Sequence, residues 1–183
     1  MELGKAIESR RSIRSFNDKV LDKNIIVDIL NHAILAPSAK NRQPWYFVVI
    51  QNPDLKKEIG DSLYTKMGDV SKITSNVIKD CQALVLVYAD IEDMIMDTVS
   101  VGACIENLIL RATDLEVASL WIGFILHVEQ ELKEKLQIDK KLVSAVALGY
   151  SLEKPNKRPR KSLEEVSRWY LWIGMKVQRK LAF

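Results

Sequence analysis

The chain has 183 residues, of which 48% are hydrophobic and 28% charged, a composition typical of one ordinary globular domain. Its net charge of +3 is too small to argue for nucleic-acid binding. The two histidines are far apart and the two cysteines lie in apolar runs, so no metal site is expected. No apolar run has membrane-spanning length and no signal peptide is recognisable, so no membrane contact and a cytoplasmic location are expected.

The first third of the chain predicts three helices and one strand. Residues 3–10 have the apolar spacing of a short helix. Asp22 is placed to cap a second helix, with a buried stripe of Ile25, Ile26, Ile29, Leu30 and Ala33. Residues 45–50 are β-branched and aromatic, as in a strand. Asn52 and Pro53 are placed as the N-cap and first residue of a third helix.

The middle of the chain is dominated by apolar runs. The polar residues 67–80, interrupted by Gly68, are assigned to no element. Residues 83–89 are continuously apolar and predict a central strand. Residues 92–115 form the longest helical pattern, apolar over most of its circumference, which places it in the middle of the core or at a subunit interface. Residues 117–124 predict a third strand.

The last third begins with a charged helix at 129–136 and a fourth strand at 142–148. Helices and strands therefore alternate, which predicts a sheet with helices on its faces. Residues 153–161 read as an extended loop with clustered positive charge, and Ser162 with Glu165 predicts a capping box.

The carboxyl-terminal residues 168–183 are rich in aromatic side chains, which are Trp169, Tyr170, Trp172 and Phe183. So much aromatic surface is poorly accommodated in water. We expect residues 1–167 to form a single domain, and residues 168–183 to be a tail that packs on this body or on a partner subunit.

Two segments near the amino terminus indicate a ligand site. Residues 10–16 (Arg-Arg-Ser-Ile-Arg-Ser-Phe) form a dense anion-binding stretch, and residues 36–45 form a loop full of amide and hydroxyl groups that ends in tryptophan. This layout suits a bound phosphorylated ring cofactor. The simpler alternatives are a solvated charged face for the first segment and a polar turn for the second.

With four later segments, these resemble the nitroreductase family of FMN-dependent oxidoreductases, and the resemblance runs from Leu3 to about Val166. The matching stretches are residues 10–16, 36–38 with 41–45, 107–112 (Asn-Leu-Ile-Leu-Arg-Ala), 120–123 (Leu-Trp-Ile-Gly), 147–150 (Ala-Leu-Gly-Tyr) and 158–166. The resemblance implies an α+β fold with a mixed, mostly antiparallel sheet flanked by helices. It also implies a homodimer with the long helix at its interface and two FMN sites there.

The resemblance assigns cofactor contacts to the first segment. Arg10 and Ser12 would hold phosphate and ribityl oxygens, and Arg158 and Arg160 would complete the phosphate site, since guanidinium groups bind phosphate through paired hydrogen bonds. Arg14 would lie near the pyrimidine edge of the ring, where negative charge develops on reduction. Arg11 belongs to the same candidate segment, although a structural or surface role is expected for it.

Two further stretches complete the candidate site. The loop residues Pro37, Ser38, Ala39, Asn41 and Gln43 would reach the flavin, in part from the neighbouring subunit. Ile122 and Gly123 would pass the flavin edge with a backbone N–H directed at ring atom N5, since glycine permits close approach of a backbone to a ligand. Ordinary turn chemistry is the alternative for Gly123.

The chain also departs from the family pattern. Residues 114–119 replace a turn that is often glycine-rich, and the chain is short for the family. Relatives carry an Asn and a Lys near the ring, for which Lys72, Asn76 and Lys79 are the nearby candidates. Their roles are left open.

The implied activity is hydride transfer from NADH or NADPH through flavin N5 to a nitroaromatic, a quinone or a similar acceptor, by a ping-pong mechanism. The cofactor carries this chemistry, so no catalytic side chain is expected. Two alternatives remain, namely a specialised dehalogenating or flavin-degrading branch and a flavin-binding protein without turnover.

Overall fold

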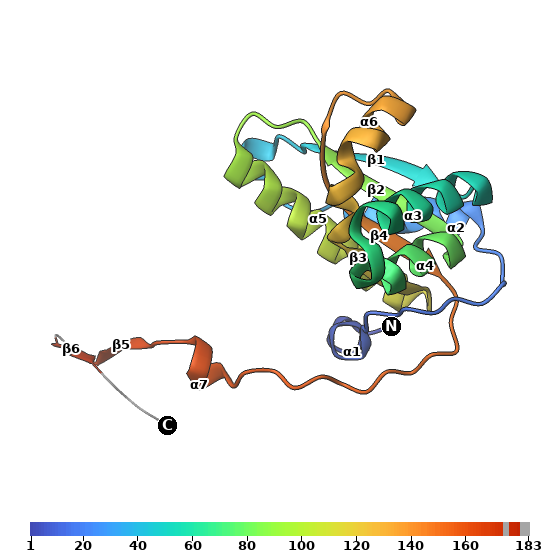
Figure 1. The fold of residues 1–183 in the computed structure, drawn as a ribbon. Coiled ribbons are helices and arrows are strands. Elements are labelled where there is room, and N and C mark those ends of the chain that lie inside the picture. Colours follow the sequence, from blue (N-terminus) through green and yellow to red (C-terminus); the bar gives the residue numbers. More distant parts are fainter. Residues whose placement is uncertain (174–175, 180–183) are drawn as a thin grey trace.

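The computed structural model describes residues 1–173 and 176–179, which form an α+β fold around a four-stranded sheet (Figure 1). The α-helices are α1 (Leu3–Ser9), α2 (Lys23–Ala33), α3 (Pro53–Met67), α4 (Lys72–Asp80), α5 (Met94–Asp114), α6 (Glu129–Leu136) and α7 (Leu163–Val166). The strands are β1 (Trp45–Ile50), β2 (Ala83–Ala89), β3 (Ala118–Ile122), β4 (Lys141–Gly149), β5 (Tyr170–Ile173) and β6 (Lys176–Arg179). Three 3-10 turns are η1 (Ala39–Asn41), η2 (Gly68–Ser71) and η3 (Phe124–Val128).

The main sheet has the strand order β1-β2-β4-β3, and its strand pairs are antiparallel. One isolated parallel bridge joins Ser12 to Ser119 at the β3 edge. Every residue of β2 is buried, which confirms the prediction of a central strand. An apolar strand of this kind requires cover on both faces of the sheet.

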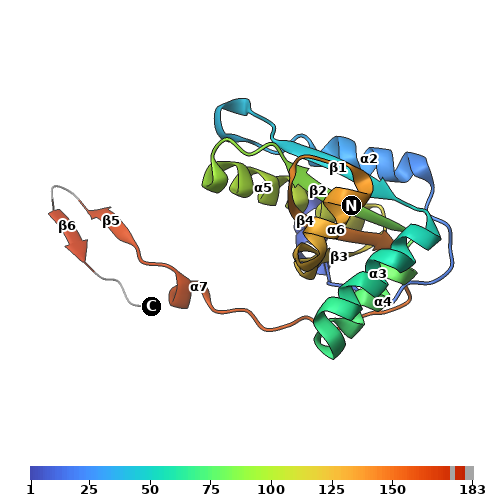
Figure 2. The same ribbon diagram turned by 45° about the horizontal axis from the view of Figure 1, so that its top comes forward.

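Successive side chains of β2 point to opposite faces and build two cores. Val85 and Val87 pack with residues of α2 and α5. Leu84 and Leu86 pack with residues of α3, α4 and α6 on the other face. Figure 2 shows α2 and α5 on one side of the sheet and α3 and α4 on the other.

The predicted helix starts are confirmed by their caps. The Asp22 carboxylate accepts the N–H of Asn24 at 2.6 Å, and the Asn52 side chain accepts the N–H of Leu55 at 2.9 Å. Residues 67–80, which the sequence left unassigned, contain the end of α3, η2 and α4. Gly68 separates the two helices because its φ of 63° suits glycine and ends α3.

Helix α5 buries one side and exposes apolar residues on the other. Val101, Cys104, Ile105, Leu108 and Ala112 are buried against the sheet. Away from the sheet, the first two turns expose Ile95 and Val99 one turn apart on the same side, and Met94 and Met96 are exposed on either flank. The all-round apolar pattern of this helix therefore covers both a core face and a surface face.

Both cysteines are free and buried, as their apolar neighbours predicted. Burial raises the pKa of the Cys81 thiol and of the Cys104 thiol to about 12. A thiol with such a pKa is almost wholly protonated at neutral pH, and a protonated thiol is a poor nucleophile.

After β4, residues 150–162, here called the linker, lead away from the body to α7 and the β5–β6 hairpin (Figures 1 and 2). The predicted capping box of Ser162 and Glu165 is present at the start of α7. Trp169 and Tyr170 are exposed, and Phe183 lies outside the described residues. Docking of the tail on the body or a partner stays a prediction.

No described helix has the length and apolarity needed to cross a membrane.

Candidate functional site

Residues 10–16, here called segment 10–16, are held in an extended path along the β3 edge of the sheet. The N–H of Ile13 donates to the carbonyl of Ser119 at 3.0 Å, and Asn17 N–H donates to the Tyr150 carbonyl at 2.8 Å. The Ile13 side chain is buried while Arg14 is exposed. The segment is therefore anchored by its backbone and by the apolar side chains of Ile13 and Phe16, whereas Arg14 faces solvent.

A carboxylate ties segment 10–16 to the linker. Oε2 of Glu153 accepts the N–H groups of Arg14, at 2.9 Å, and Ser15, at 3.1 Å. The residue was not among the candidates predicted from sequence, because the contact spans 139 positions and depends on the tertiary fold.

The candidate arginines differ in what they bind within the chain. Among the described residues, Arg10, Arg14, Arg158 and Arg160 make no ion pair with a carboxylate, and the side-chain hydrogen bonds of Arg14 and Arg160 go to backbone carbonyls. Nη1 of Arg11 instead donates to the carbonyls of Glu8, at 2.7 Å, and Arg10, at 2.8 Å. Arg11 thus donates hydrogen bonds to carbonyl groups at the carboxyl-terminal end of α1, which otherwise lack partners within the helix. This contact is structural in character.

The other candidate loop, residues 37–43, has an unusual backbone. Lys40, Asn41 and Gln43 have φ values of 53°, 55° and 49°, and the left-handed region costs a non-glycine residue roughly 1–2 kcal/mol. Within the loop, Ser38 Oγ accepts the N–H of Gln43 at 3.0 Å. This hydrogen bond therefore joins the two ends of loop 37–43.

Loop 37–43 is also bonded to the first turns of α5. The N–H of Ala39 donates to Ser100 Oγ at 3.3 Å. The guanidinium of Arg42 binds Asp97 through two hydrogen bonds of 3.1 Å and also pairs with Glu92. Neither Arg42 nor Asp97 was predicted as part of the site, since no local pattern links residues 55 positions apart.

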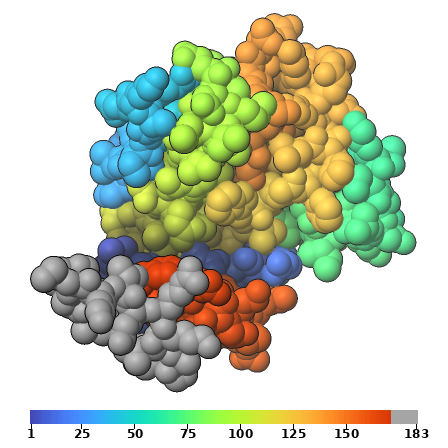
Figure 3. Space-filling model, turned by 90° about the vertical axis from the view of Figure 1, so that its left-hand side faces the viewer, coloured from blue at the N-terminus to red at the C-terminus, as the bar shows by residue number. Residues whose placement is uncertain are grey.

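The structure places segment 10–16 and loop 37–43 at opposite ends of α5. The loop contacts Asp97 and Ser100 near the helix start. At the other end, the amino-terminal ammonium of Met1 pairs with Asp114, and segment 10–16 contacts β3 just beyond. A helix of 21 residues is about 30 Å long. Figure 3 shows the loop in cyan beside α5, with the blue amino-terminal residues below.

The third candidate stretch ends β3. Ser144 Oγ accepts the indole N–H of Trp121 at 2.7 Å and donates to the carbonyl of Ile122 at 3.0 Å. Ile122 is buried, whereas Gly123 is exposed with a φ of −80°. A Cβ at Gly123 would meet no atom of the described chain within 4 Å. Neither its backbone angle nor its neighbours in the chain demand glycine there.

A family model, the "Nitroreductase family", matches residues 7–150. The chain belongs to the nitroreductase family.

Relatives of known name and structure agree with this. A protein from Archaeoglobus fulgidus named "Putative NADH dehydrogenase/NAD(P)H nitroreductase" is 33% identical over 150 residues, covering 80% of this chain and 83% of the relative. A crystal structure of a "putative nitroreductase in complex with fmn" from Desulfovibrio desulfuricans superposes with a TM-score of 0.81 at 25% identity, covering 94% and 99% of the two chains. A BluB-like flavoprotein from Clostridium difficile gives a TM-score of 0.77 at 25% identity, covering 92% and 99%.

The nitroreductase match contains most of the candidate site. Segment 10–16, loop 37–43 and the end of β3 all lie within residues 7–150, while Arg158 and Arg160 lie beyond them on the linker. The described structure contains no hydrogen bond or ion pair that joins these two arginines to segment 10–16. Their place in the site stays a prediction.

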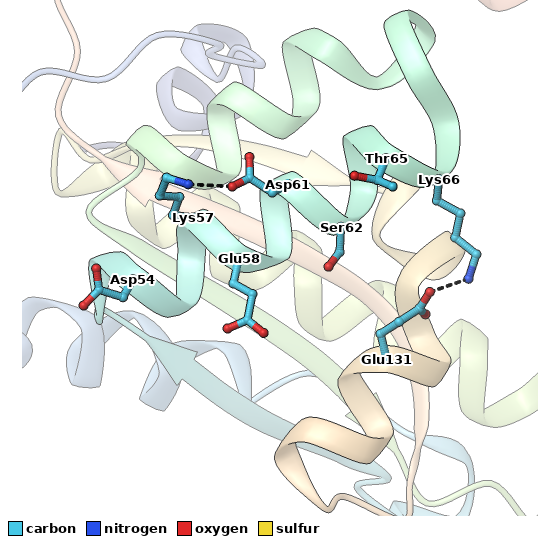
Figure 4. A pocket seen from close by; sticks show the side chains of 8 residues that line it. All are labelled: Asp54, Lys57, Glu58, Asp61, Ser62, Thr65, Lys66 and Glu131. Carbon is cyan, nitrogen blue, oxygen red and sulfur yellow. Dashed lines mark hydrogen bonds and ion pairs between the residues drawn. The ribbon is translucent and has the colours of Figure 1, made fainter.

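The roles of Lys72, Asn76 and Lys79 were left open by the sequence, and of these three residues Lys79 has an ion-pair partner. Its ammonium pairs with Asp61 of α3 at 2.5 Å, whereas Lys72 and Asn76 are exposed on α4. Asp61 lines a surface hollow between α3 and α6 (Figure 4). The hollow contains no residue of the candidate site, and both of its lysines are already paired, Lys57 with Asp61 and Lys66 with Glu131, at 2.7 Å each. It has the character of a solvated groove between two helices of the nitroreductase fold.

Proposed function

We propose that the chain is an FMN-dependent oxidoreductase that acts as a homodimer and passes hydride from NADH or NADPH to a small acceptor such as a nitroaromatic compound or a quinone. The separation of segment 10–16 from loop 37–43 carries this proposal. They lie at the two ends of α5, too far apart for one flavin. Two copies paired along α5 in opposite directions would bring the segment of one to the loop of the other.

The outer face of α5 supports this pairing. Ile95 is 74% exposed and Val99 66% exposed, and Met94 and Met96 lie exposed beside them. Exposed apolar side chains one helical turn apart, such as Ile95 and Val99, are typical of an interface face on a helix. In such a dimer, the linker and α7, which lead away from the body, would extend over the partner.

The donor set fits FMN. Arg10 and Arg14 carry guanidinium groups without a carboxylate partner among the described residues, which suits a phosphate and an anionic ring. Ser38, Asn41 and Gln43 present hydroxyl and amide groups suited to the polar edge of a flavin. Bound FMN would supply the hydride chemistry. The chain's own residues would bind the cofactor, orient it and exclude water.

The purified protein tests this directly. We expect it to be yellow, to release FMN rather than FAD on heating, and to lose its flavin absorbance when mixed anaerobically with NADH or NADPH. Light scattering should give twice the chain mass of 20.9 kDa. FAD, or a chain that ignores added FMN, would overturn the site. Bound FMN that neither nicotinamide reduces would instead favour a flavin-binding protein without turnover.

A further inference from the structure

Loop 37–43 holds a backbone that two of its residues, Lys40 and Gln43, do not favour. Three of its residues, Lys40, Asn41 and Gln43, have positive φ and none is glycine. Such a conformation persists only where surrounding contacts determine it. The contacts within the loop, including Gln43 N–H to Ser38 Oγ, close the turn but do not attach it to the body.

The attachment of the loop to the body is centred on one carboxylate, beside the longer Ala39 N–H to Ser100 Oγ bond and the pairing of Arg42 with Glu92. Asp97 is 1% exposed. Its Oδ1 accepts Nε of Arg42, and its Oδ2 accepts Nη2 of Arg42 and the N–H groups of Glu92 and Asp93, the last two at 2.9 Å. Four donors therefore satisfy both oxygens. One end of this network is the loop and the other is the beginning of α5.

The geometry requires arginine in particular. The two bonds from Arg42 to Asp97 are parallel and equal in length, at 3.1 Å, which is the paired arrangement that a planar guanidinium makes with a carboxylate. A lysine would supply the charge but only a point contact. Because Arg42 lies between Asn41 and Gln43, this fork fixes the chain beside both candidate cofactor contacts.

We infer that Arg42 and Asp97 are a positioning pair, which holds loop 37–43 in the conformation that binds FMN without touching the cofactor. This inference rests on the proposed function. It predicts that the pair contributes to FMN affinity through preorganisation, because a loop that is already in its bound shape loses less entropy on binding.

The test measures FMN affinity of the refolded apo-protein by quenching of FMN fluorescence, alongside thermal unfolding without FMN. We expect R42M to weaken FMN binding roughly tenfold or more. We expect R42K to bind FMN nearly as weakly as R42M does. D97N should weaken binding similarly. The double variant R42M/D97N should be no worse than either single variant, since the two residues act as a unit. The double variant also leaves no unpaired buried charge, so it remains informative if a single variant fails to fold.

A second, more exposed Arg–Asp pair on the same helix provides the control. Arg111 of α5 binds Asp28 of α2, with Nε and Nη2 at 3.1 and 2.5 Å. We expect D28N to lower the unfolding temperature while FMN affinity stays unchanged.

The outcomes separate cleanly. Folded R42M that binds FMN like the unaltered protein overturns the inference. So does a loss of affinity in D28N as large as in R42M, because general destabilisation would then explain both. An unaltered protein that fails to bind FMN overturns the proposed function itself.

Discussion

At the residue scale, the placement of Arg14 predicts a role in the energetics of reduction. Its guanidinium is exposed at the edge of segment 10–16 and has no carboxylate partner among the described residues. If it lies near the pyrimidine edge of FMN, it stabilises the anionic reduced ring. R14A should then lower the flavin reduction potential, on the order of tens of millivolts, and slow reduction by nicotinamide more than it weakens FMN binding.

Arg160 provides the comparison, because a phosphate contact is remote from the ring. R160A should weaken FMN binding and leave the reduction potential nearly unchanged. Potentiometric titration of both variants decides the matter. An unchanged potential in R14A would remove Arg14 from the ring edge and leave it as one of several solvated cations.

Asp97 has a consequence for acid stability. Hydrogen bonds from backbone N–H groups, together with Arg42, lower the pKa of its carboxyl. Because the pKa is lower in the folded state than in the unfolded state, the carboxylate stabilises the fold at pH values above the unfolded pKa of about 3.9. This contribution is lost as the pH falls through the lower folded value.

The pH dependence of D97N checks this sign. Urea unfolding at neutral pH should find D97N less stable than the unaltered protein, and the difference should shrink at pH 3 and below. A difference that stays constant over this range would mean that the ionised carboxylate is not the stabilising form.

At the element scale, the outer face of α5 is the proposed dimer interface. V99E places a charge on this face, where a monomer would tolerate it within about 0.5 kcal/mol. We therefore expect V99E to stay folded, to become monomeric by light scattering and to lose FMN. V70E is the matched control, because Val70 of η2 is 67% exposed, close to the 66% of Val99. Dimeric V99E with bound FMN would place the interface elsewhere.

At the scale of the whole molecule, α7 and the described residues that follow it lie away from the body at the end of the linker (Figure 1). The exposed residues of the tail, among them Trp169 and Tyr170, are large and partly apolar. A chain ending after Ser167 should therefore form a weaker dimer, because a tail that wraps a partner adds apolar area to the interface. Sedimentation over a range of concentrations measures the dissociation constant. An unchanged constant would mean that the tail does not contribute to the dimer.

Much of the fold could be predicted because its signals are local. The caps at Asp22 and Asn52, the break at Gly68 and the unbroken apolar run of β2 each concern a few neighbouring residues. Such patterns act through backbone hydrogen bonds and side-chain periodicity, which depend little on the rest of the chain. The candidate segments were recognised in the same way.

Only the tertiary structure decided how these parts meet. The pairing of Arg42 with Asp97 and the contact of Glu153 with segment 10–16 join residues 55 and 139 positions apart, which no local pattern encodes. Helix α5 was apolar all round in sequence, and its packing decided which side became core. The same packing set the two halves of the candidate site at opposite ends of one helix, because a rigid helix of this length keeps its ends apart.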